Sequence, residues 1–247
     1  MIRIRQPLFS ALVVAFSLTV SQSACADIVL SSTRIIYKAA MKDATIRMEN
    51  KGERPLLVQS WFDTGDQNAD PGSINVPFVA TPPVSRVDAK QGQTVKVTYT
   101  GSQPLASDRE SIFWFNVLEV PPKLPDSEAK GKNLLQLAFR TRIKLFYRPD
   151  GLEGTASEAP AKQQWQLRQT GGHAVIHITN PTPFYISFNS INLQAAGKRY
   201  LLNSSMIAPK SDLDEQVQGL SSRPASASIE YSAISDFGGV IKGNVAL

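Results

Sequence analysis

The chain has almost no cysteine. Its single cysteine, Cys25, lies near the start of the 247 residues, in a segment that we expect to be removed from the mature protein. Without a cysteine pair the mature chain cannot form an intramolecular disulfide, even in an oxidising compartment. Its stability must therefore come from packed hydrophobic cores.

The chain also lacks a long hydrophobic run. No stretch reaches the roughly 18 apolar residues of a membrane-spanning helix, and the mostly apolar run Leu8–Val20 is only about thirteen residues long. It follows Arg3 and Arg5 and precedes the small residues Ala24-Cys25-Ala26. This order predicts a signal peptide over residues 1–26 and therefore an exported protein. Cys25 leaves a lipoprotein as an alternative, but the residues before it are Gln-Ser-Ala rather than a stretch led by Leu.

Histidine and the common catalytic motifs are scarce. His173 and His177 are the only histidines, and four residues apart on a strand they would lie roughly 13 Å apart, too far to chelate one metal ion together. Asp212 and Asp214 look like turn residues, so neither histidine has an obvious acid partner. The sequence has no phosphate-binding loop ending in Gly-Lys-Ser/Thr and no Gly-x-Ser-x-Gly elbow. We therefore expect a binding protein that is not an enzyme and uses no metal, cofactor or nucleotide.

The charge is nearly balanced. Loss of Arg3 and Arg5 with the leader takes the Lys and Arg count from 26 to 24, against 21 Asp and Glu, which leaves a net charge of +3. The sequence has no basic run, so nothing predicts a nucleic-acid partner.

What the chain does contain is a succession of short β-rich segments separated by turn residues. Apolar and polar residues alternate in Thr45–Glu49 and Thr94–Thr98, which is typical of half-buried strands. About 220 mature residues with this pattern predict two immunoglobulin-like sandwiches. Turn formers in Arg148–Gly154 predict a hinge, with a cleft between the domains. The predicted domains are residues 27–149 and 150–247, and the predicted strands include Ala44–Asn50, Phe78–Thr81, Ser111–Val120, Leu134–Arg148 and Asp214–Leu220.

One segment carries a family resemblance. Leu105–Pro121 reads LASDRESIFWFNVLEVP and resembles the signature of the periplasmic pilus (fimbrial) chaperones of the chaperone–usher pathway. Other landmarks of that family follow in the expected order: Thr33-Arg34, Ala80–Val84, Ile143–Pro149, Asn180–Tyr185 and Ile234–Gly239. The short loop Pro121–Asn133 and the missing cysteine pair resemble the short F–G loop subclass. The resemblance covers nearly the whole mature chain.

The resemblance implies a boomerang of two immunoglobulin-like domains and assigns roles to several residues. Arg34 and Lys144 match the two cleft cations that hold the C-terminal carboxylate of a pilus subunit. The charged residues Glu110, Arg148 and Asp236 match a salt-bridge network between the domains, which would set the angle of the cleft rather than add much stability. Thr81-Pro82 is a candidate for a cis peptide bond, since such bonds are almost confined to proline.

The segment Leu134–Arg148 is where alternation and resemblance disagree. Alternation alone would bury its odd-numbered apolar residues in the first domain and expose its charged residues. The resemblance instead makes Leu135, Leu137 and Phe139 exposed residues of a donor strand, lent to the open groove of an incomplete subunit by β-augmentation. Lys144 has the opposite parity, which requires a twist or bulge after Phe139, or a groove that reaches both faces.

The function implied by the resemblance is that of an ATP-independent periplasmic chaperone. It would fold pilus subunits by donor-strand complementation and deliver them to an outer-membrane usher. An exposed apolar edge risks aggregation, against which Arg140 and Arg142 on the other face, or self-capping in a dimer, would protect the free chaperone. The alternative is a structural pilus subunit or adhesin, although such a subunit would be a single incomplete domain, commonly with a cysteine pair. An enzyme such as a hydrolase ranks third.

Overall fold

The computed structural model describes residues 27–123, 135–203, 206–220, 224 and 226–247. The predicted signal peptide, most of the loop Pro121–Asn133 and the first residue of the predicted donor strand, Leu134, lie outside the described residues.

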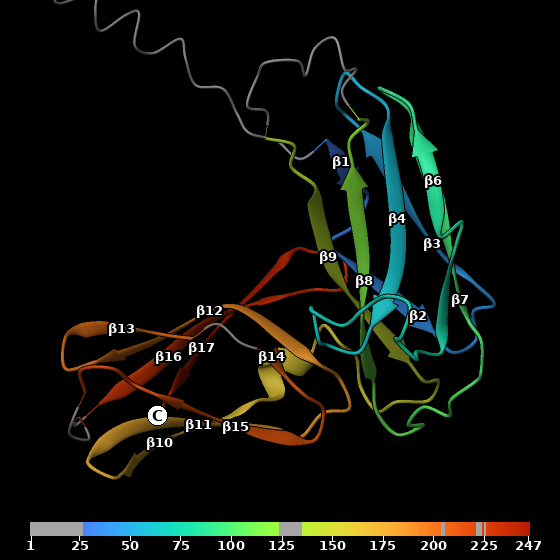
Figure 1. The fold of residues 1–247 in the computed structure, drawn as a ribbon. Coiled ribbons are helices and arrows are strands. Elements are labelled where there is room, and N and C mark those ends of the chain that lie inside the picture. The colour runs from blue at the N-terminus through green and yellow to red at the C-terminus, as the bar shows by residue number, and fades with distance from the viewer. Residues whose placement is uncertain (1–26, 124–134, 204–205, 221–223, 225) are drawn as a thin grey trace, which may run out of the picture.

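The first domain is a sandwich of two sheets (Figure 1). One has the order β1-β3-β7-β5 and the other the order β2-β9-β8-β4-β6, and the β2–β9 pair is parallel whereas the other pairs are antiparallel. The strands are β1 Ile28–Leu30, β2 Arg34–Lys38, β3 Ala44–Asn50, β4 Leu56–Asp63, β5 Phe78–Thr81, β6 Val84–Val87, β7 Gly92–Tyr99, β8 Ser111–Val120 and β9 Phe139–Arg148. The strand bounds predicted for Ala44–Asn50, Phe78–Thr81 and Ser111–Val120 are confirmed.

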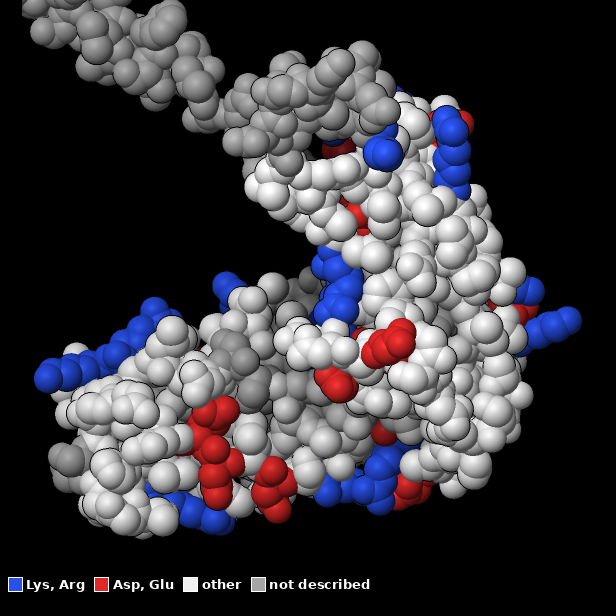
Figure 2. Space-filling view, viewed as in Figure 1, with Lys and Arg blue, Asp and Glu red and all other residues white. Residues whose placement is uncertain are grey.

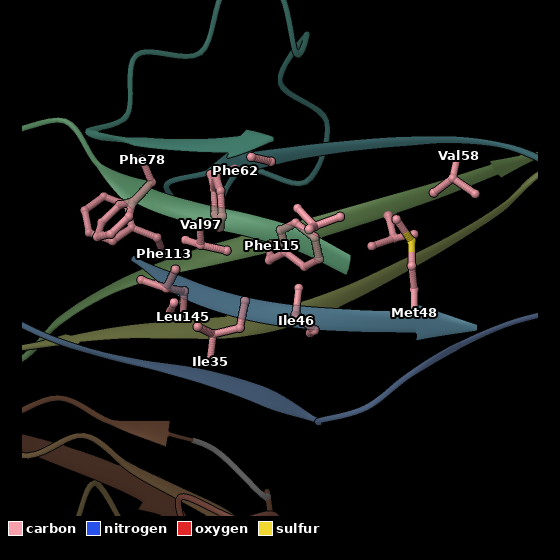
Figure 3. Packing of buried hydrophobic residues seen from close by; sticks show 14 of the residues in the cluster. Ile35, Ile46, Met48, Val58, Phe62, Phe78, Val97, Phe113, Phe115 and Leu145 are labelled. Carbon is pink, nitrogen blue, oxygen red and sulfur yellow. The ribbon is translucent and has the colours of Figure 1, made fainter. Parts of the chain in front are cut away.

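The core of this domain forms because alternate residues of each strand point between the sheets. In β3 the buried residues Ala44, Ile46 and Met48 alternate with exposed ones. Figure 3 shows Ile46 and Met48 from one sheet facing Phe115 and Val58 from the other. The Phe62 and Phe115 rings lie with their centroids 5.2 Å apart, and a dry core of this kind replaces the disulfide that the sequence lacks.

The second domain is also a sandwich. Its sheets have the orders β10-β11-β15 and β13-β12-β16-β17, with β14 paired to β12. The elements are β10 Gln164–Thr170, β11 His173–Asn180, β12 Ile186–Ala195, β13 Lys198–Leu202, β14 Met206–Ile207, β15 Ser211–Gln216, β16 Ala227–Ile234 and β17 Val240–Ala246, and a single 3₁₀ turn, Ala159–Lys162, precedes them. Its separate core includes Ile176, Ile191, Leu193 and Ile229. Within the described ranges no helix has the length and apolar character needed to cross a bilayer.

The two sandwiches meet at an angle and leave an open hollow between them (Figures 1 and 2). The predicted fold class is therefore confirmed. The chain passes between the domains just after β9, where Gly151 and Gly154 have φ angles of 75° and 79°. These left-handed conformations strongly favour glycine, which explains the turn residues of the predicted hinge. The Thr81-Pro82 bond is cis.

The predicted strand Leu134–Arg148 is too long within the described residues, because β9 begins only at Phe139. The ladder between β8 and β9 ends with Glu119 opposite Phe139. Beyond it, β8 runs into Pro121 and Pro122, which have no amide hydrogen to continue the ladder. The side chain of Gln136 donates to the carbonyl oxygens of both prolines, at 3.2 and 2.9 Å, in place of a backbone pairing.

The predictions for Asp212, Asp214 and the strand Asp214–Leu220 were wrong in position. Both aspartates lie in β15, which spans Ser211–Gln216. Aspartate is disfavoured in strands, but here each carboxylate accepts a hydrogen bond from the residue facing it on β11: Asp212 from Thr179 at 2.5 Å and Asp214 from His177 at 2.6 Å. These cross-strand pairs compensate for the low strand propensity.

Candidate functional site

Two cations from distant parts of the sequence lie side by side where the two domains meet. Arg34 begins β2, and in the parallel β2–β9 pair it stands opposite Lys144. The Arg34 side chain reaches the second domain, where its Nη1 donates to the carbonyl oxygen of Ile234 at 3.1 Å. Arg34 is only 8 % exposed, and its Nε has no hydrogen-bond partner within the described part of the chain.

Lys144 is bound to the second domain in a similar way. Its Nζ donates to the hydroxyl oxygen of Ser187, on β12, at 2.9 Å. Burial, and secondly the charge of Arg34, lower the pKa of Lys144 to about 8. No carboxylate of the described residues lies within salt-bridge distance of either cation. Two neighbouring cations without a directly bound anion have the chemistry to bind a carboxylate.

Glu110, Arg148 and Asp236 form a cluster between the domains. The Arg148 guanidinium donates through Nε to Glu110 at 2.7 Å and through Nη1 and Nη2 to the two carboxylate oxygens of Asp236, at 2.7 and 2.9 Å. Burial raises the pKa of Glu110, although the Arg148 charge opposes this. Such a bidentate geometry fixes direction as well as distance.

Further contacts join the two domains near this cluster. The amide of Tyr185 donates to the second oxygen of Glu110 at 2.8 Å, and the amide of Glu110 donates to the carbonyl of Pro183 at 2.9 Å. The rings of Phe146 and Tyr185 lie 5.7 Å apart. Glu110 therefore contacts the second domain through both its backbone and its side chain.

The three predicted donor residues are exposed. Leu135 is 84 %, Leu137 55 % and Phe139 50 % accessible, whereas Leu145, further along β9, is fully buried in the core of the first domain. Alternation, which predicted burial of the whole row, fails at its N-terminal end because that end extends past the sandwich core. Apolar side chains as large as these rarely remain exposed in a row without a partner.

The backbone beside this row has an unpaired edge. Along Phe139–Ile143, β9 pairs with β8 on one side. Its other neighbour in the sheet, β2, pairs only with Lys144–Arg148. Among the described strands, none covers the second edge of Phe139–Ile143. Its N–H and C=O groups can therefore accept another strand, which would end at Arg34 and Lys144.

The opposite parity of Phe139 and Lys144 involves no bulge. Residues 139 to 147 pair with β8 without a register shift, so the alternative of a bulge is excluded. The odd-numbered residues Ile143, Leu145 and Tyr147 face the first core, whereas Lys144 and Phe146 face the second domain. The strand thus presents different faces to two different partners.

Arg142 is less exposed than the alternation predicted. It forms an ion pair with the carboxylate of Asp63, whose Oδ2 accepts from the Arg142 Nε at 2.9 Å, and it stacks on Trp114 with 4.6 Å between the guanidinium carbon and the ring centroid. Although burial opposes the shift, the hydrogen bonds from Arg142 and Asn116 lower the pKa of Asp63. Arg140 remains exposed.

Sequence reasoning missed Ser187 at the site and one pair elsewhere in the second domain. Ser187 was not predicted, because a lone serine in a strand carries no signal for a contact with Lys144. His177 was described as lacking an acid partner, yet its Nδ1 lies 2.6 Å from Asp214. No group of three metal-ligating side chains lies within the described ranges.

Comparison with known proteins agrees with this architecture. Residues 27–153 match the family described as "Pili and flagellar-assembly chaperone, PapD N-terminal domain", and residues 158–245 match "Pili assembly chaperone PapD, C-terminal domain". The chain is 60 % identical, over 228 residues and 92 % of each chain, to the probable fimbrial chaperone YadV of Escherichia coli K12.

Solved structures give the same result. The crystal structure of the YadV chaperone has a TM-score of 0.78 and 56 % identity, covering 90 % of this chain and 100 % of that one. The SafB chaperone of Salmonella enterica, solved in complex with the SafA pilin, has a TM-score of 0.73 and 29 % identity, covering 92 % and 98 %.

Proposed function

We propose that this chain, which belongs to the family of pilus-assembly chaperones, captures pilus subunits in the periplasm by lending them β9. Arg34 and Lys144 would hold the subunit's C-terminal carboxylate. The open edge and apolar side chains at the start of β9 would complete the subunit's unfinished fold. Like the YadV relative, the protein is a chaperone and not a pilus component, and each of its sandwiches has its own core.

The observation that carries the proposal is the coincidence of three features along one segment of the chain. The exposed apolar row, the unpaired backbone edge and the cationic pair follow one another along Leu135–Lys144. An apolar row alone would suit many partners, and a cation pair alone would suit many anions. Together they select a polypeptide with an apolar groove, a strand edge to pair and a nearby chain terminus.

The geometry also supports one strand direction. A subunit strand on the open edge of Phe139–Ile143 must bring its C-terminal carboxylate to Lys144, which lies at the C-terminal end of that segment. It would therefore run parallel to β9 and end where β2, also parallel to β9, begins. The subunit strand and β2 would then pair, one after the other, with the same edge of β9.

Apolar burial would provide much of the affinity. At roughly 25 cal/mol per Å² of apolar surface, three large side chains can contribute several kcal/mol before the cost of association is subtracted. The exposed row of Leu135, Leu137 and Phe139 would then be covered in the complex. In the free chaperone a second copy would cover the same row in a self-capping dimer.

We further propose that the complex docks on an outer-membrane usher, where the next subunit's N-terminal extension replaces β9. The chain has no phosphate-binding loop, so exchange of one strand for another would drive release without ATP. The domains proposed for this cycle are residues 27–149 and 150–247, held at a fixed angle by Glu110, Arg148 and Asp236.

Co-expression tests the proposal directly. A subunit encoded beside this gene is expressed in the periplasm with and without the tagged chaperone, and the material bound to the tag is analysed. We expect a one-to-one complex and a subunit that is degraded when the chaperone is absent. Equal subunit recovery in both cultures, with nothing bound to the tag, would contradict the proposal.

Capture should weaken in mildly alkaline solution. The pKa of Lys144 is about 8 in the free chaperone, and a bound carboxylate would raise it again, since an opposite charge favours the protonated form. Affinity is then full below pH 8 and falls by up to about tenfold for each pH unit above it, while the subunit carboxylate and Arg34 keep their charges. Titration of the purified pair between pH 7 and 9.5 measures this slope, and a flat profile would exclude Lys144 as the anchor.

A further inference from the structure

A buried carboxylate at the end of β8 has no role in the function proposed above. Glu119 is 2 % exposed, and burial raises the pKa of its carboxyl group. Its Oε2 accepts a hydrogen bond from the amide of Ile28 at 3.2 Å, and the amide of Asp27 also donates to the carboxylate. Its Oε1 has no partner within the described residues. A buried carboxylate is costly unless a cation accompanies it.

Asp27, the first described residue, lies against the Glu119 carboxylate and makes further contacts there. The carbonyl of Asp27 accepts a hydrogen bond from the amide of Lys51 at 2.7 Å. The carboxyl group of Asp27 lies over Gly52, where a Cβ atom would come within 2.5 Å of its Cγ. A side chain at position 52 would have to displace the Asp27 carboxyl group. Residue 27 is held by its carbonyl oxygen and by its main-chain nitrogen.

Removal of the predicted leader changes the chemistry of that nitrogen. Hydrolysis of the Ala26–Asp27 peptide bond consumes one water and leaves a carboxylate on Ala26 and an amine on Asp27, which takes up a proton. The nitrogen then carries three hydrogens and a positive charge instead of one hydrogen and none. We propose that Glu119 is the receptor for this new α-ammonium group, and that the ion pair forms only in the processed chain.

The pair would lie directly beneath the donor residues. Glu119 stands opposite Phe139 in the β8–β9 ladder. A shallow pocket at this end of the sandwich is lined by Asp27, Arg54, Glu119, Leu135, Leu137 and Phe139, among others. Removal of the leader would therefore add an ion pair next to the donor residues, and the donor residues would be less stably held in an unprocessed chain.

The test compares two N-termini in two backgrounds. The exported full-length protein is purified from the periplasm and its N-terminus is identified by mass spectrometry. The same mature sequence is made in the cytoplasm with the initiator methionine retained before Asp27. Both forms are prepared as wild type and as Glu119→Gln, and their unfolding midpoints are measured. The extra residue should lower the wild-type midpoint by about 4 °C, and the Glu119→Gln midpoint by much less.

Glu119→Gln also separates electrostatics from sterics. If the extra methionine acts merely by its bulk, it lowers the midpoint equally in both backgrounds, and the proposal is overturned. A Glu49→Gln variant, which removes an exposed carboxylate from neighbouring β3, should leave the effect of the extension unchanged. An N-terminus other than Asp27 in the exported protein would also overturn the proposal.

A pH series on the wild-type pair remains informative even if Glu119→Gln does not fold. An α-amine ordinarily has a pKa of about 7.7 to 8.0, and pairing with Glu119 would raise it in the folded state. The extra stability of the processed form is then full below about pH 7.7 and lost as the pH rises through the raised value. The other charged groups at the pocket are the Asp27 carboxylate and Arg54. A midpoint difference that does not change up to pH 10 would contradict the pair.

Discussion

Lys144→Ala should abolish recovery of the subunit complex while leaving the chaperone folded. Truncating one member of a sheltered charge pair costs 2 to 5 kcal/mol, so we expect affinity to fall on the order of 100-fold or more. Stability should not fall with it. Burial and the Arg34 charge both disfavour the ammonium of Lys144, as its lowered pKa shows, so removal of this charge offsets the loss of its hydrogen bond to Ser187.

Measured on the same preparation, the affinity for the subunit should therefore fall while the unfolding midpoint of the chaperone does not. Arg34→Ala should also lose capture, but with some loss of stability, because Arg34 donates to Ile234 and its guanidinium lies 5.9 Å from the Phe146 ring centroid. Lys96→Ala is the matched control, since Lys96 lies on β7 in the opposite sheet with its side chain half-exposed. An unchanged complex yield for Lys144→Ala would remove the anchor from the proposed mechanism.

Leu137→Glu should have an effect of similar size through a different interaction. The free chaperone exposes 55 % of Leu137 to water, so glutamate there is readily tolerated. In the complex the side chain would enter the apolar groove of the subunit, where an unpaired carboxylate is strongly disfavoured. We expect affinity to drop on the order of 100-fold, from the lost apolar burial and the added desolvation.

The control for this variant is Leu201→Glu. Leu201 is 71 % exposed, on β13 of the second domain, and the same substitution there should leave capture intact. Surface plasmon resonance with a purified subunit, or yield on co-expression, measures both. If Leu137→Glu binds normally while Leu201→Glu does not, the subunit contacts a different surface and the donor strand is misassigned.

The sequence predicted most of the strands because their residues alternate between a core and a surface. β3 and β8 have the predicted bounds, and the apolar residues Ile46, Phe115 and Val117 are buried as alternation predicts. The polar residues Asn50, Asn116 and Glu119 are buried as well, which alternation did not predict. The sequence could not predict where β9 starts. That boundary depends on Pro121 and Pro122, which are distant in sequence from Phe139 and end the ladder from the partner strand. Local periodicity carries no information about such a partner.

The candidate site was likewise predicted only in part from the sequence. The family motifs located Arg34 and Lys144, and the structure adds that they stand opposite one another on adjacent strands. Ser187 lies 43 residues from Lys144, and only the docking of one domain on the other brings the two together. Contacts that depend on domain placement leave no trace in short sequence patterns, which explains why Ser187 was missed whereas the cations were found.

The uninterrupted pairing of β9 implies a selection by length. Lys144 lies five residues after Phe139 with no register shift, a span of about 17 Å at the usual rise per residue. A subunit strand must cover this span to place its carboxylate at the cations and its side chains toward the donor row. With one residue more or less, the carboxylate would not reach the cations, or every side chain would point to the opposite face. In the proposed complex, β9 would therefore favour subunit strands of one particular length over strands that are shorter or longer by one residue.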